Sequence, residues 1–462
     1  MCMKLKMTFL VLAMLFLSDN AWLQNVESTY KSVQSSSHDI VILKGHVISK
    51  GRGVPYASLQ LIATGSKRMH MDSCSASHFS IGVICNDVGE YEFRIPSGHE
   101  HDTVLVRSMG YVSYKTTVAR LLRYGNVRLE SHSIELKIVT VTSYRTSLQL
   151  LNDVVKHIGR NYQQHTAWST FFYRDWRTVD GELYLFDEAV MSFRRSSYSQ
   201  YADKRSYRLD PSQREMESNI KTLLRHRLVV YDRKLLETKI IRSAGCDQML
   251  SYVDDEDFFD PVATPQASYA LANRMLKEHE FESLKEFSTD GEEYYIVCSM
   301  GPNRRPGVRV RYEYTIRKRD LAIVRLVSSQ QPSRRRAPND AWVNWYFNSL
   351  VIDADSSVWT YEVRDGHYTL TRYYNSKSYH LESRNRSRIG KVQRWQQCHD
   401  WVLTDFSLCP VEVEEKPLSV TPQTIAGAFG RSDYSSDFWG QYNWVPIDVL
   451  PLRLLNEKIY KP

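Results

Sequence analysis

The stretch that decides the fold begins with Asn86–Phe93, which reads NDVGEYEF, and continues to Ser108–Tyr111, which reads SMGY. Each phrase places a tight turn beside a strand in which apolar and polar residues alternate, as they do on a half-buried β-strand. Gly89 follows an Asn-Asp pair, at a hairpin position that favours positive φ. Gly110 allows the backbone to bend before Tyr111 returns to the core. The pattern predicts a small β-sandwich.

Short strand-like runs surround these two phrases at regular spacing. They comprise residues 40–48, 57–62, 79–84, 91–95, 103–107 and 112–118. About seven short strands separated by turns are typical of a sandwich, so residues 38–143 are predicted to form one. Residues 66–78 are interpreted as an insertion between its second and third strands.

The same residues resemble the carboxypeptidase regulatory-like domain. The resemblance rests on VPYA at 54–57, on NDVGEYEF with Asp87, Gly89 and Phe93, and on SMGY with Gly110 and Tyr111. It implies a transthyretin-like β-sandwich of a kind common in exported proteins of the Bacteroidetes. It implies no peptidase activity, because the regulatory module carries no catalytic residues.

The rest of the chain, residues 144–462, predicts a helix followed by a large antiparallel sheet. Apolar residues recur at helical spacing from Leu148 to Tyr162, after a cap at Thr146 or Ser147. Asp-Gly pairs at 180–181, 290–291 and 365–366, and the sequence KRD at 318–320, lie between strand-like runs and predict four hairpins. Residues 342–352 predict a further strand, whereas 211–228 and 266–277 predict helices. The expected fold class is mainly β, with a sandwich followed by an α+β domain built on a curved antiparallel sheet.

The N-terminus indicates export. Lys4 and Lys6 precede an apolar run over residues 8–17, which is followed by polar residues. This is the pattern of a signal peptide, placed here at residues 1–24, and the run is too short to span a bilayer. We therefore expect a protein of the periplasm or outer membrane, without a transmembrane helix in the mature chain. Envelope proteins or outer-membrane components are the expected partners, because a net charge of +7 does not indicate nucleic-acid binding.

Six cysteines follow the predicted signal peptide, namely Cys74, Cys85, Cys246, Cys298, Cys398 and Cys409. In an exported chain, Cys74–Cys85 and Cys398–Cys409 could each close a small disulfide loop. Six free or half-buried thiols are the alternative. Because no C-x-x-C spacing occurs, the cysteines do not indicate a zinc site.

The sequence contains no motif that indicates a catalytic, cofactor or metal site. It lacks a G-x-S-x-G elbow, a P-loop and a dinucleotide fingerprint. The runs HEHD at 99–102, DDED at 254–257 and HEFE at 279–282 are interpreted as solvated loops, because neighbouring residues rarely converge on one ion. Arg174 and Glu188 are expected to form an ion pair across one hairpin rather than to perform acid–base chemistry. We therefore expect no enzyme, no cofactor and no metal.

Part of the second region resembles Bacteroidetes envelope proteins of unassigned role. The resemblance rests on FYRD at 172–175, with Tyr173 and Arg174, on Glu188-Ala189, and on Asp437-Phe438-Trp439. The arrangement of one helix and a curved sheet is also similar to the half-barrel of periplasmic lipoprotein carriers, at the level of fold only. The function expected is a non-enzymatic role in binding or assembly at the cell envelope. A carrier or sensor of a lipid-like ligand and a hydrolase with a site not visible in sequence are the alternatives.

A lipid-like ligand would need an apolar lining, and tryptophans of the second region are the candidates. They are Trp168, Trp176, Trp342, Trp345 and Trp359. The alternative is that these side chains fill the core between the sheet and its helix.

Overall fold

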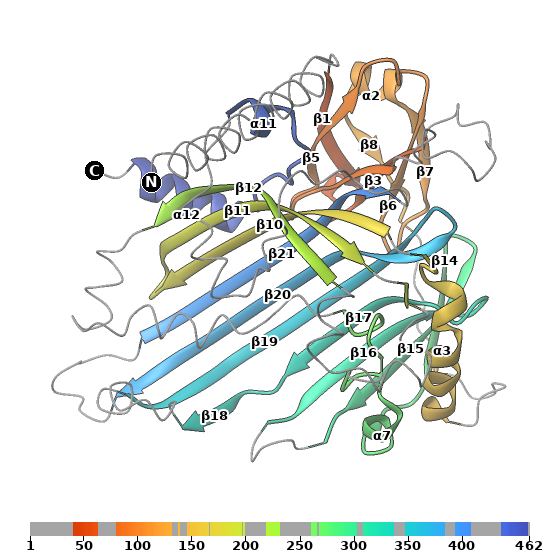
Figure 1. Ribbon diagram of the computed structural model, residues 1–462, viewed down its shortest axis with the longest axis vertical. Helices are drawn as coiled ribbons and strands as arrows, with labels where there is room; N and C mark the ends of the chain where they lie inside the picture. Colours follow the sequence, from red (N-terminus) through yellow and green to blue (C-terminus); the bar gives the residue numbers. More distant parts are fainter. Residues whose placement is uncertain are drawn as a thin grey trace, which may run out of the picture.

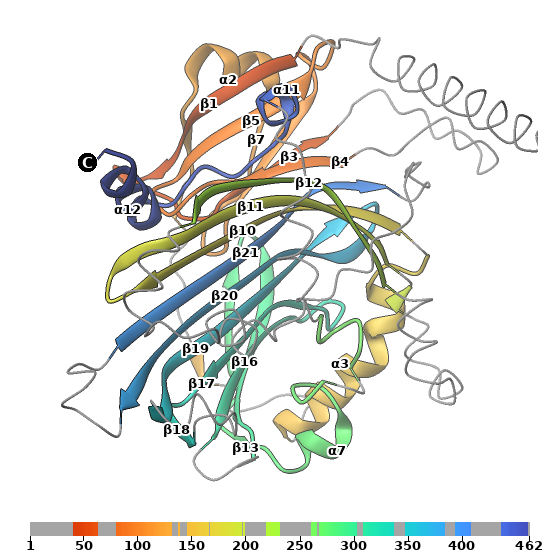
Figure 2. The same cartoon turned by 60° about the vertical axis from the view of Figure 1, so that its left-hand side comes forward.

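The computed structural model describes most of the chain between residues 40 and 460 (Figures 1 and 2). The described ranges are 40–62, 80–131, 137–138, 146–165, 167–195, 197–198, 219–231, 260–265, 268–302, 308–336, 347–383, 393–407 and 436–460. The predicted signal peptide, the insertion at 66–78, the acidic run at 254–257, Trp342, Trp345, Cys74, Cys246 and Cys409 lie outside these ranges.

The N-terminal part is a two-layer β-sandwich. One sheet contains β1 (Ile40–Ser49), β2 (Arg52–Gly53), β5 (Glu90–Pro96) and β8 (Val127–Arg128). The other contains β3 (Ser58–Ile62), β4 (Ser80–Ile84), β6 (Thr103–Arg107) and β7 (Tyr114–Thr117), and α2 (Val118–Tyr124) follows β7. The core between the sheets includes Leu43, Val47, Leu59, Phe93 and Val106, and the predicted strands are confirmed.

The two glycines of the deciding stretch adopt backbone conformations that other residues rarely adopt. Gly89 has a φ of +81°, and a Cβ built there would lie 2.4 Å from the backbone oxygen of Val47. Gly110 has a φ of +88° in the turn before Tyr111, and Tyr111 forms a β-bridge with Ser131. The turn at Gly89 therefore requires glycine both for its φ and for the close approach of another strand.

The second part begins with α3 (Ser147–Asn161), whose apolar face packs into the largest core of the protein. The helix has Thr146 as its N-cap, and the Thr146 side chain accepts a hydrogen bond of 3.2 Å from the backbone N–H of Gln149. Both the helix and its predicted cap are confirmed.

Replacement of Thr146 with alanine is expected to lower the free energy of unfolding by about 1 kcal/mol, because it removes the acceptor for one of the free N–H groups of the helix. Thr146→Ser keeps that oxygen and is the matched control. Urea unfolding followed by circular dichroism measures both variants. Equal losses in the two would show that the capping oxygen contributes nothing.

A large curved antiparallel sheet forms the rest of the fold. Its strands run in the spatial order β12-β11-β10-β21-β20-β19-β17-β16-β15-β14-β9, with β18 paired to β19 and β13 paired to β15. Their bounds are β9 Lys137–Ile138, β10 Ala167–Val179, β11 Glu182–Arg195, β12 Asn219–Tyr231, β13 Glu280–Phe281, β14 Lys285–Thr289, β15 Glu292–Met300, β16 Val310–Arg317, β17 Ile323–Gln330, β18 Ser333–Arg336, β19 Phe347–Arg364, β20 His367–Ser383 and β21 Gln393–Ser407. All four predicted hairpins are present. The predicted fold class is thereby confirmed.

Two helix predictions were wrong in whole or in part. Residues 219–228 of the predicted helix at 211–228 belong to β12, which extends the sheet beyond β11. Within 266–277 only α7 (Asn273–Leu276) is helical among the described residues. In β12 the ladder to β11 outweighs a weak helical pattern, since tertiary context overrides local propensity.

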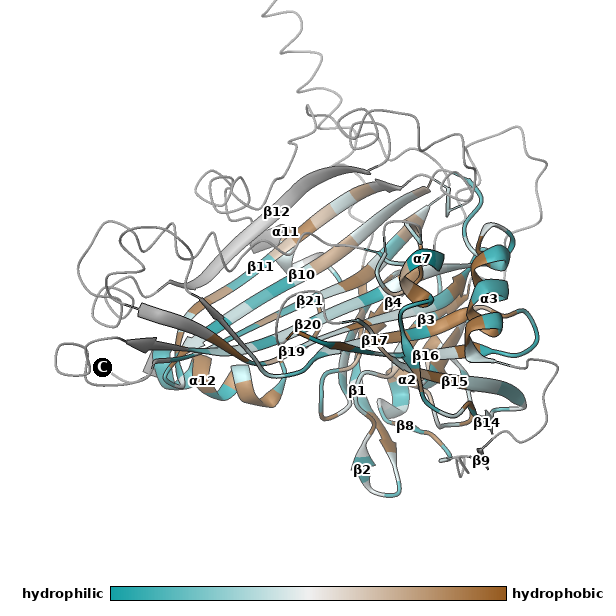
Figure 3. Cartoon of the chain, turned by 90° about the horizontal axis from the view of Figure 1, so that it is seen from below, coloured by the Kyte–Doolittle hydropathy of each residue, from teal (hydrophilic) through white to brown (hydrophobic). Residues whose placement is uncertain are grey.

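The sheet has two faces with different coverings. On the α3 face, side chains such as Phe171, Tyr173 and Trp401 join the core that contains α3. The opposite face carries Phe172 and Trp176, which pack against the C-terminal residues and α12 (Val449–Tyr460). We call this second side the α12 face. Figure 2 shows the sandwich and α12 on one side of the sheet and α3 on the other, and Figure 3 shows the mixture of apolar and polar residues along β10 and β11.

Candidate functional site

A buried ion pair lies at the centre of the α12 face. Arg174 on β10 donates hydrogen bonds of 2.8 and 2.6 Å from Nε and Nη2 to Oε1 of Glu188 on β11. The register places the two residues directly opposite each other, and both side chains are almost fully buried. The ion pair expected from the sequence is present. Arg174 also donates to the backbone oxygens of Val445 and Pro446.

Those two carbonyls belong to the C-terminal segment, which we define as residues 436–460 with α11 (Ser436–Gln441) and α12. The same segment binds the deciding stretch of the sandwich. The backbone N–H of Asp87 donates to Asp448 at 2.9 Å, and the N–H of Val449 donates back to the Asp87 carboxylate at 3.0 Å. Asn86 donates to the backbone oxygen of Ile447. The residues NDVGEYEF and FYRD are thus joined through one segment.

A second pair of contacts on the segment engages strand β5. Asn443 accepts a hydrogen bond of 2.6 Å from the backbone N–H of Arg94 and donates one of 2.8 Å to the backbone oxygen of the same residue. The Arg94 guanidinium donates to the backbone oxygen of Gly440 and lies over the Trp444 ring. We call this set of contacts the joint, because it fixes the sandwich to the curved sheet.

The joint continues on β20 and β21. Arg372 forms two hydrogen bonds of 2.9 Å with the Asp400 carboxylate and lies 3.9 Å from the centre of the Tyr56 ring. The Tyr56 hydroxyl donates to Asp448. Burial, with the negative charge of Asp400, raises the pKa of the Asp448 carboxyl above its ordinary value. Tyr56 has a φ of +55°, a strained conformation for a bulky residue, which the joint holds in place.

The α3 face carries a polar cluster that bears on the hydrolase alternative. Arg177 forms hydrogen bonds of 3.0, 3.0 and 2.6 Å with Asp175. Burial acts to raise the pKa of Asp175, but Arg177 and His399 outweigh it and hold that pKa below its ordinary value. Tyr173 and Asp175 approach the same nitrogen of His399, Nδ1, at 3.0 and 3.8 Å. A proton relay through an imidazole uses both ring nitrogens, so this geometry does not form one from tyrosine to aspartate.

The candidate lining tryptophans within the described residues do not gather in one place. Trp359 lies on the α3 face, where it stacks on Tyr373 with ring centres 5.3 Å apart inside the largest core. Trp176 lies on the α12 face and packs against Leu455. Trp168 shares the side of β10 that carries Trp176, because the two positions differ by an even number. The sheet therefore separates Trp359 from the other two.

The two histidine runs considered for metal binding have other partners. His279 contacts Ser299 through Nδ1 at 2.9 Å and stacks on Tyr312. His99 pairs with Asp102 at 2.6 Å. Among the described residues, no three His, Cys, Asp or Glu side chains gather as a group that could hold a metal ion.

The described cysteines, Cys85, Cys298 and Cys398, are free and buried. For Cys85 and Cys398 the alternative of free thiols therefore applies. Their proposed disulfide partners, Cys74 and Cys409, lie outside the described residues. Burial raises the pKa of the Cys398 thiol to about 11, so this thiol is protonated and unreactive at neutral pH.

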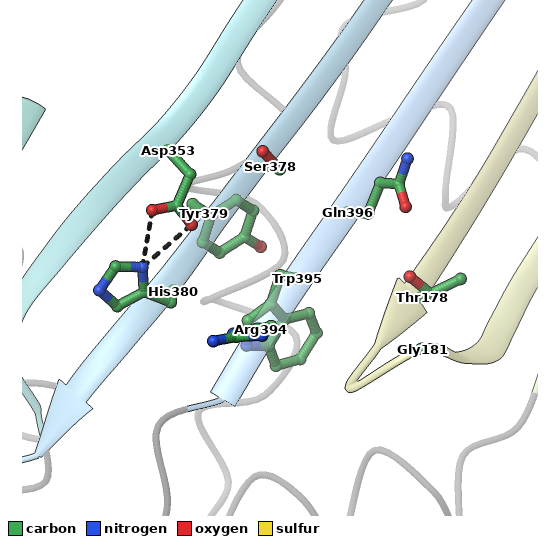
Figure 4. A pocket seen from close by; sticks show the side chains of 9 residues that line it. All are labelled: Thr178, Gly181, Asp353, Ser378, Tyr379, His380, Arg394, Trp395 and Gln396. Carbon is green, nitrogen blue, oxygen red and sulfur yellow. Dashed lines mark hydrogen bonds and ion pairs between the residues drawn. The ribbon is translucent and has the colours of Figure 1, made fainter. Parts of the chain in front are cut away.

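A cleft of about 470 Å³ opens where β20 ends and β21 begins, beside the turn between β10 and β11 (Figure 4). We call it the strand-end cleft. Its lining residues are Thr178, Gly181, Asp353, Ser378, Tyr379, His380, Arg394, Trp395 and Gln396. Gly181 belongs to the Asp-Gly turn at 180–181, which was the only local signal in the sequence. The other lining residues were not identified, because they come from four strands and no short motif contains them.

The comparisons with known proteins give little guidance. No protein-family model matches the chain, and no curated protein does. A solved structure of a DUF1329 family protein from Desulfovibrio piger ATCC 29098 is 11% identical, with 58% of this chain and 93% of that chain covered and a TM-score of 0.23. A protein of unknown function from Bacteroides fragilis NCTC 9343, described as membrane-associated, is 8% identical, with 79% and 96% covered and a TM-score of 0.13. Scores this low carry no argument about function.

Helices long and apolar enough to cross a membrane do not occur in the part of the chain that the structure describes.

Proposed function

We propose that this chain is a non-enzymatic protein of the bacterial cell envelope, in which a sandwich and a curved sheet act together as one rigid binding platform. The observation that carries the proposal is the joint. Asp87, from the motif of the regulatory-like resemblance, and Arg174 and Glu188, from the phrases of the envelope-protein resemblance, hold the C-terminal segment between the two parts. The charges of Arg174 and Glu188 are buried against other parts of the protein.

Rigid attachment supports a binding role, because a preorganised surface loses less conformational entropy when a partner binds. The runner-up, a carrier of a lipid-like ligand, has less support, since the aromatic side chains of the α3 face pack on one another and on α3. The resemblance to the carboxypeptidase regulatory-like domain, the export signal and the location in the periplasm or outer membrane belong to the same proposal.

The test is cross-linking in intact envelopes of a Bacteroidetes host that expresses the full chain. We expect the processed chain in the envelope fraction and discrete cross-linked complexes after mild treatment. Asn443→Ala removes two hydrogen bonds of the joint and is expected to deplete those complexes. Asn273→Ala, at an exposed position of α7, is the matched control and is expected to retain them.

An unprocessed chain in the cytosolic fraction would contradict the proposed location. The thermal unfolding temperature of Asn443→Ala shows whether the joint has been weakened. If it falls and the cross-linked complexes still form, the proposed role of the joint is wrong. Turnover of a hydrolase substrate that is abolished by Asp175→Asn would contradict the non-enzymatic assignment.

A further inference from the structure

We propose that the strand-end cleft is a binding site for a saccharide that carries an anionic group. The inference deepens the proposed function, on which it rests for its biological role, by giving the binding platform a ligand class and a place for the ligand. The cleft lies on the α12 face, at the ends of the strands, and its volume of about 470 Å³ falls within the range of small-molecule sites.

A row of hydroxyl and amide groups crosses three strands in this cleft. The sheet register places Thr178 of β10 opposite Gln396 of β21, and Gln396 opposite Ser378 of β20. Neighbouring strands are ~4.8 Å apart, so the row extends over ~10 Å. Each of its members both donates and accepts hydrogen bonds. Sugar hydroxyls have the same dual character, so a saccharide can satisfy the whole row.

The guanidinium of Arg394 supplies a positive charge beside this row. The backbone of Arg394 is tied to the hairpin turn, since its N–H donates to the Asp180 carboxylate at 2.9 Å and its carbonyl accepts from the Asp180 N–H at 2.7 Å. Arg174, Arg177 and Arg372, on the same sheet, each pair with a carboxylate. Within the described residues, no carboxylate pairs with the Arg394 side chain, which leaves it able to bind a carboxylate or sulfate group of a ligand in a bidentate manner.

The one carboxylate that lines the cleft is already engaged. Asp353 lies at a β-bulge of β19, and both of its oxygens are 2.9 Å from Nδ1 of His380 (Figure 4). This pair orients the imidazole, and its hydrogen bond occupies the carboxylate oxygens that would otherwise face a ligand. His380 lies opposite Arg394 in the register, so these two side chains are neighbours beside the row.

The strands beneath the cleft are held rigidly. Tyr379 and Trp395 alternate with the polar residues along β20 and β21, and their rings stack with centres 6.1 Å apart and planes within 3°. A packed support of this kind keeps a binding site in its productive geometry. Apart from these two aromatic residues and Gly181, the lining side chains are polar, which fits a saccharide better than a lipid chain.

The test is isothermal titration of the full chain with a galacturonic acid disaccharide, the neutral galactose disaccharide and inorganic phosphate. We expect the acidic disaccharide to bind at least 10-fold more tightly than the neutral one. Arg394→Gln is expected to abolish that preference, whereas Arg160→Gln, the same change at an exposed position of α3, retains it. Ser378→Ala is expected to weaken both disaccharides. Because Arg394 holds the turn through its backbone, the glutamine variant keeps this contact.

Three outcomes would overturn the inference. No heat from either disaccharide at millimolar concentration would exclude the ligand class. Binding that is unchanged in Arg394→Gln would place the site elsewhere, and phosphate that binds as tightly as the acidic disaccharide would indicate a simple anion site. If saccharide binding fails while joint-dependent envelope complexes still form, the ligand assignment is wrong and the proposed function stands. If the complexes fail to form while saccharide binding succeeds, the proposed function is wrong and the ligand assignment stands.

Discussion

Replacing Arg174 with methionine is expected to lower the free energy of unfolding by about 3–5 kcal/mol, because it leaves the Glu188 carboxylate charged, buried and without its partner. Glu188 is 0% exposed, and its Oε1 accepts both hydrogen bonds of the pair from Arg174. The variant also removes the two hydrogen bonds that Arg174 donates to the C-terminal segment. We therefore expect a large fall in the urea midpoint, measured by tryptophan fluorescence.

Two controls separate the loss of the pair from the loss of packing. Arg174→Met combined with Glu188→Leu removes both charges and is expected to recover much of the stability, since replacement of a buried pair by apolar residues is often near neutral. Lys156→Met breaks the exposed pair with Asp153 and is expected to cost less than about 1 kcal/mol. An Arg174→Met variant as stable as Lys156→Met would show that the buried pair contributes little to the joint.

The hairpins could be predicted because the chemistry of each turn is local. Asp180, Asp290 and Asp365 have φ angles of 52°, 53° and 48°, and the glycine that follows each of them also has a positive φ. Two consecutive positive φ angles define the turn that suits the right-handed twist of paired strands, and Asp-Gly adopts it readily. The Arg174–Glu188 pair was expected only because both residues lie on strands of one hairpin. The register at the turn alone would place Arg174 opposite Asp187, and the register shift between Arg177 and Thr178 brings Glu188 opposite Arg174 instead.

The joint could not be predicted, because its partners are far apart in sequence. Asn443 and Arg94 are separated by 349 residues, and Val449 and Asp87 by 362. Nothing in the pattern of either segment specifies the other. The two resemblances identified Asp87, Arg174 and Glu188 as motif residues, but they could not show that these residues meet at one segment.

The strand-end cleft depends on the registers of four strands at once. The Asp353–His380 pair forms because a register shift between Ile352 and Ala354 sets Asp353 outside the regular pairing. A β-bulge of this kind re-aims one side chain, and the sequence around it contains no glycine or proline that would indicate it. The wrong helix prediction over 219–228 has a similar origin, since the pairing with β11 decides the structure of that segment.

Asp405 is expected to destabilise the protein at neutral pH, so that Asp405→Asn raises its stability there. The residue lies where β4 of the sandwich pairs with β21 of the sheet, and its Oδ1 is buried without a hydrogen-bond partner in the described structure. Burial raises the pKa of this carboxyl from 3.8 to about 6, against the opposing effect of the Phe406 N–H. Between these two values the folded state binds more protons than the unfolded state, so stability falls as the pH rises through this window.

Each unit of pKa shift corresponds to about 1.4 kcal/mol of free energy. The raised pKa of Asp405 therefore means that its charged form lowers the stability of the folded state by up to about 3 kcal/mol above pH 6. Asp405→Asn has no charge to bury. Its gain over the natural chain is expected to be about 1–3 kcal/mol at pH 7.5 and to disappear as the pH falls toward 3.8, as measured by urea unfolding at pH 7.5, 5.0 and 4.0. Asp365→Asn, in an exposed turn whose conformation suits asparagine equally well, is the matched control and should show no such pH-dependent gain. A constant difference between Asp405→Asn and the natural chain across this range would mean that the pKa of Asp405 is the same in the folded and unfolded states. A hydrogen-bond donor to Asp405 Oδ1 would then have to lie where β4 pairs with β21.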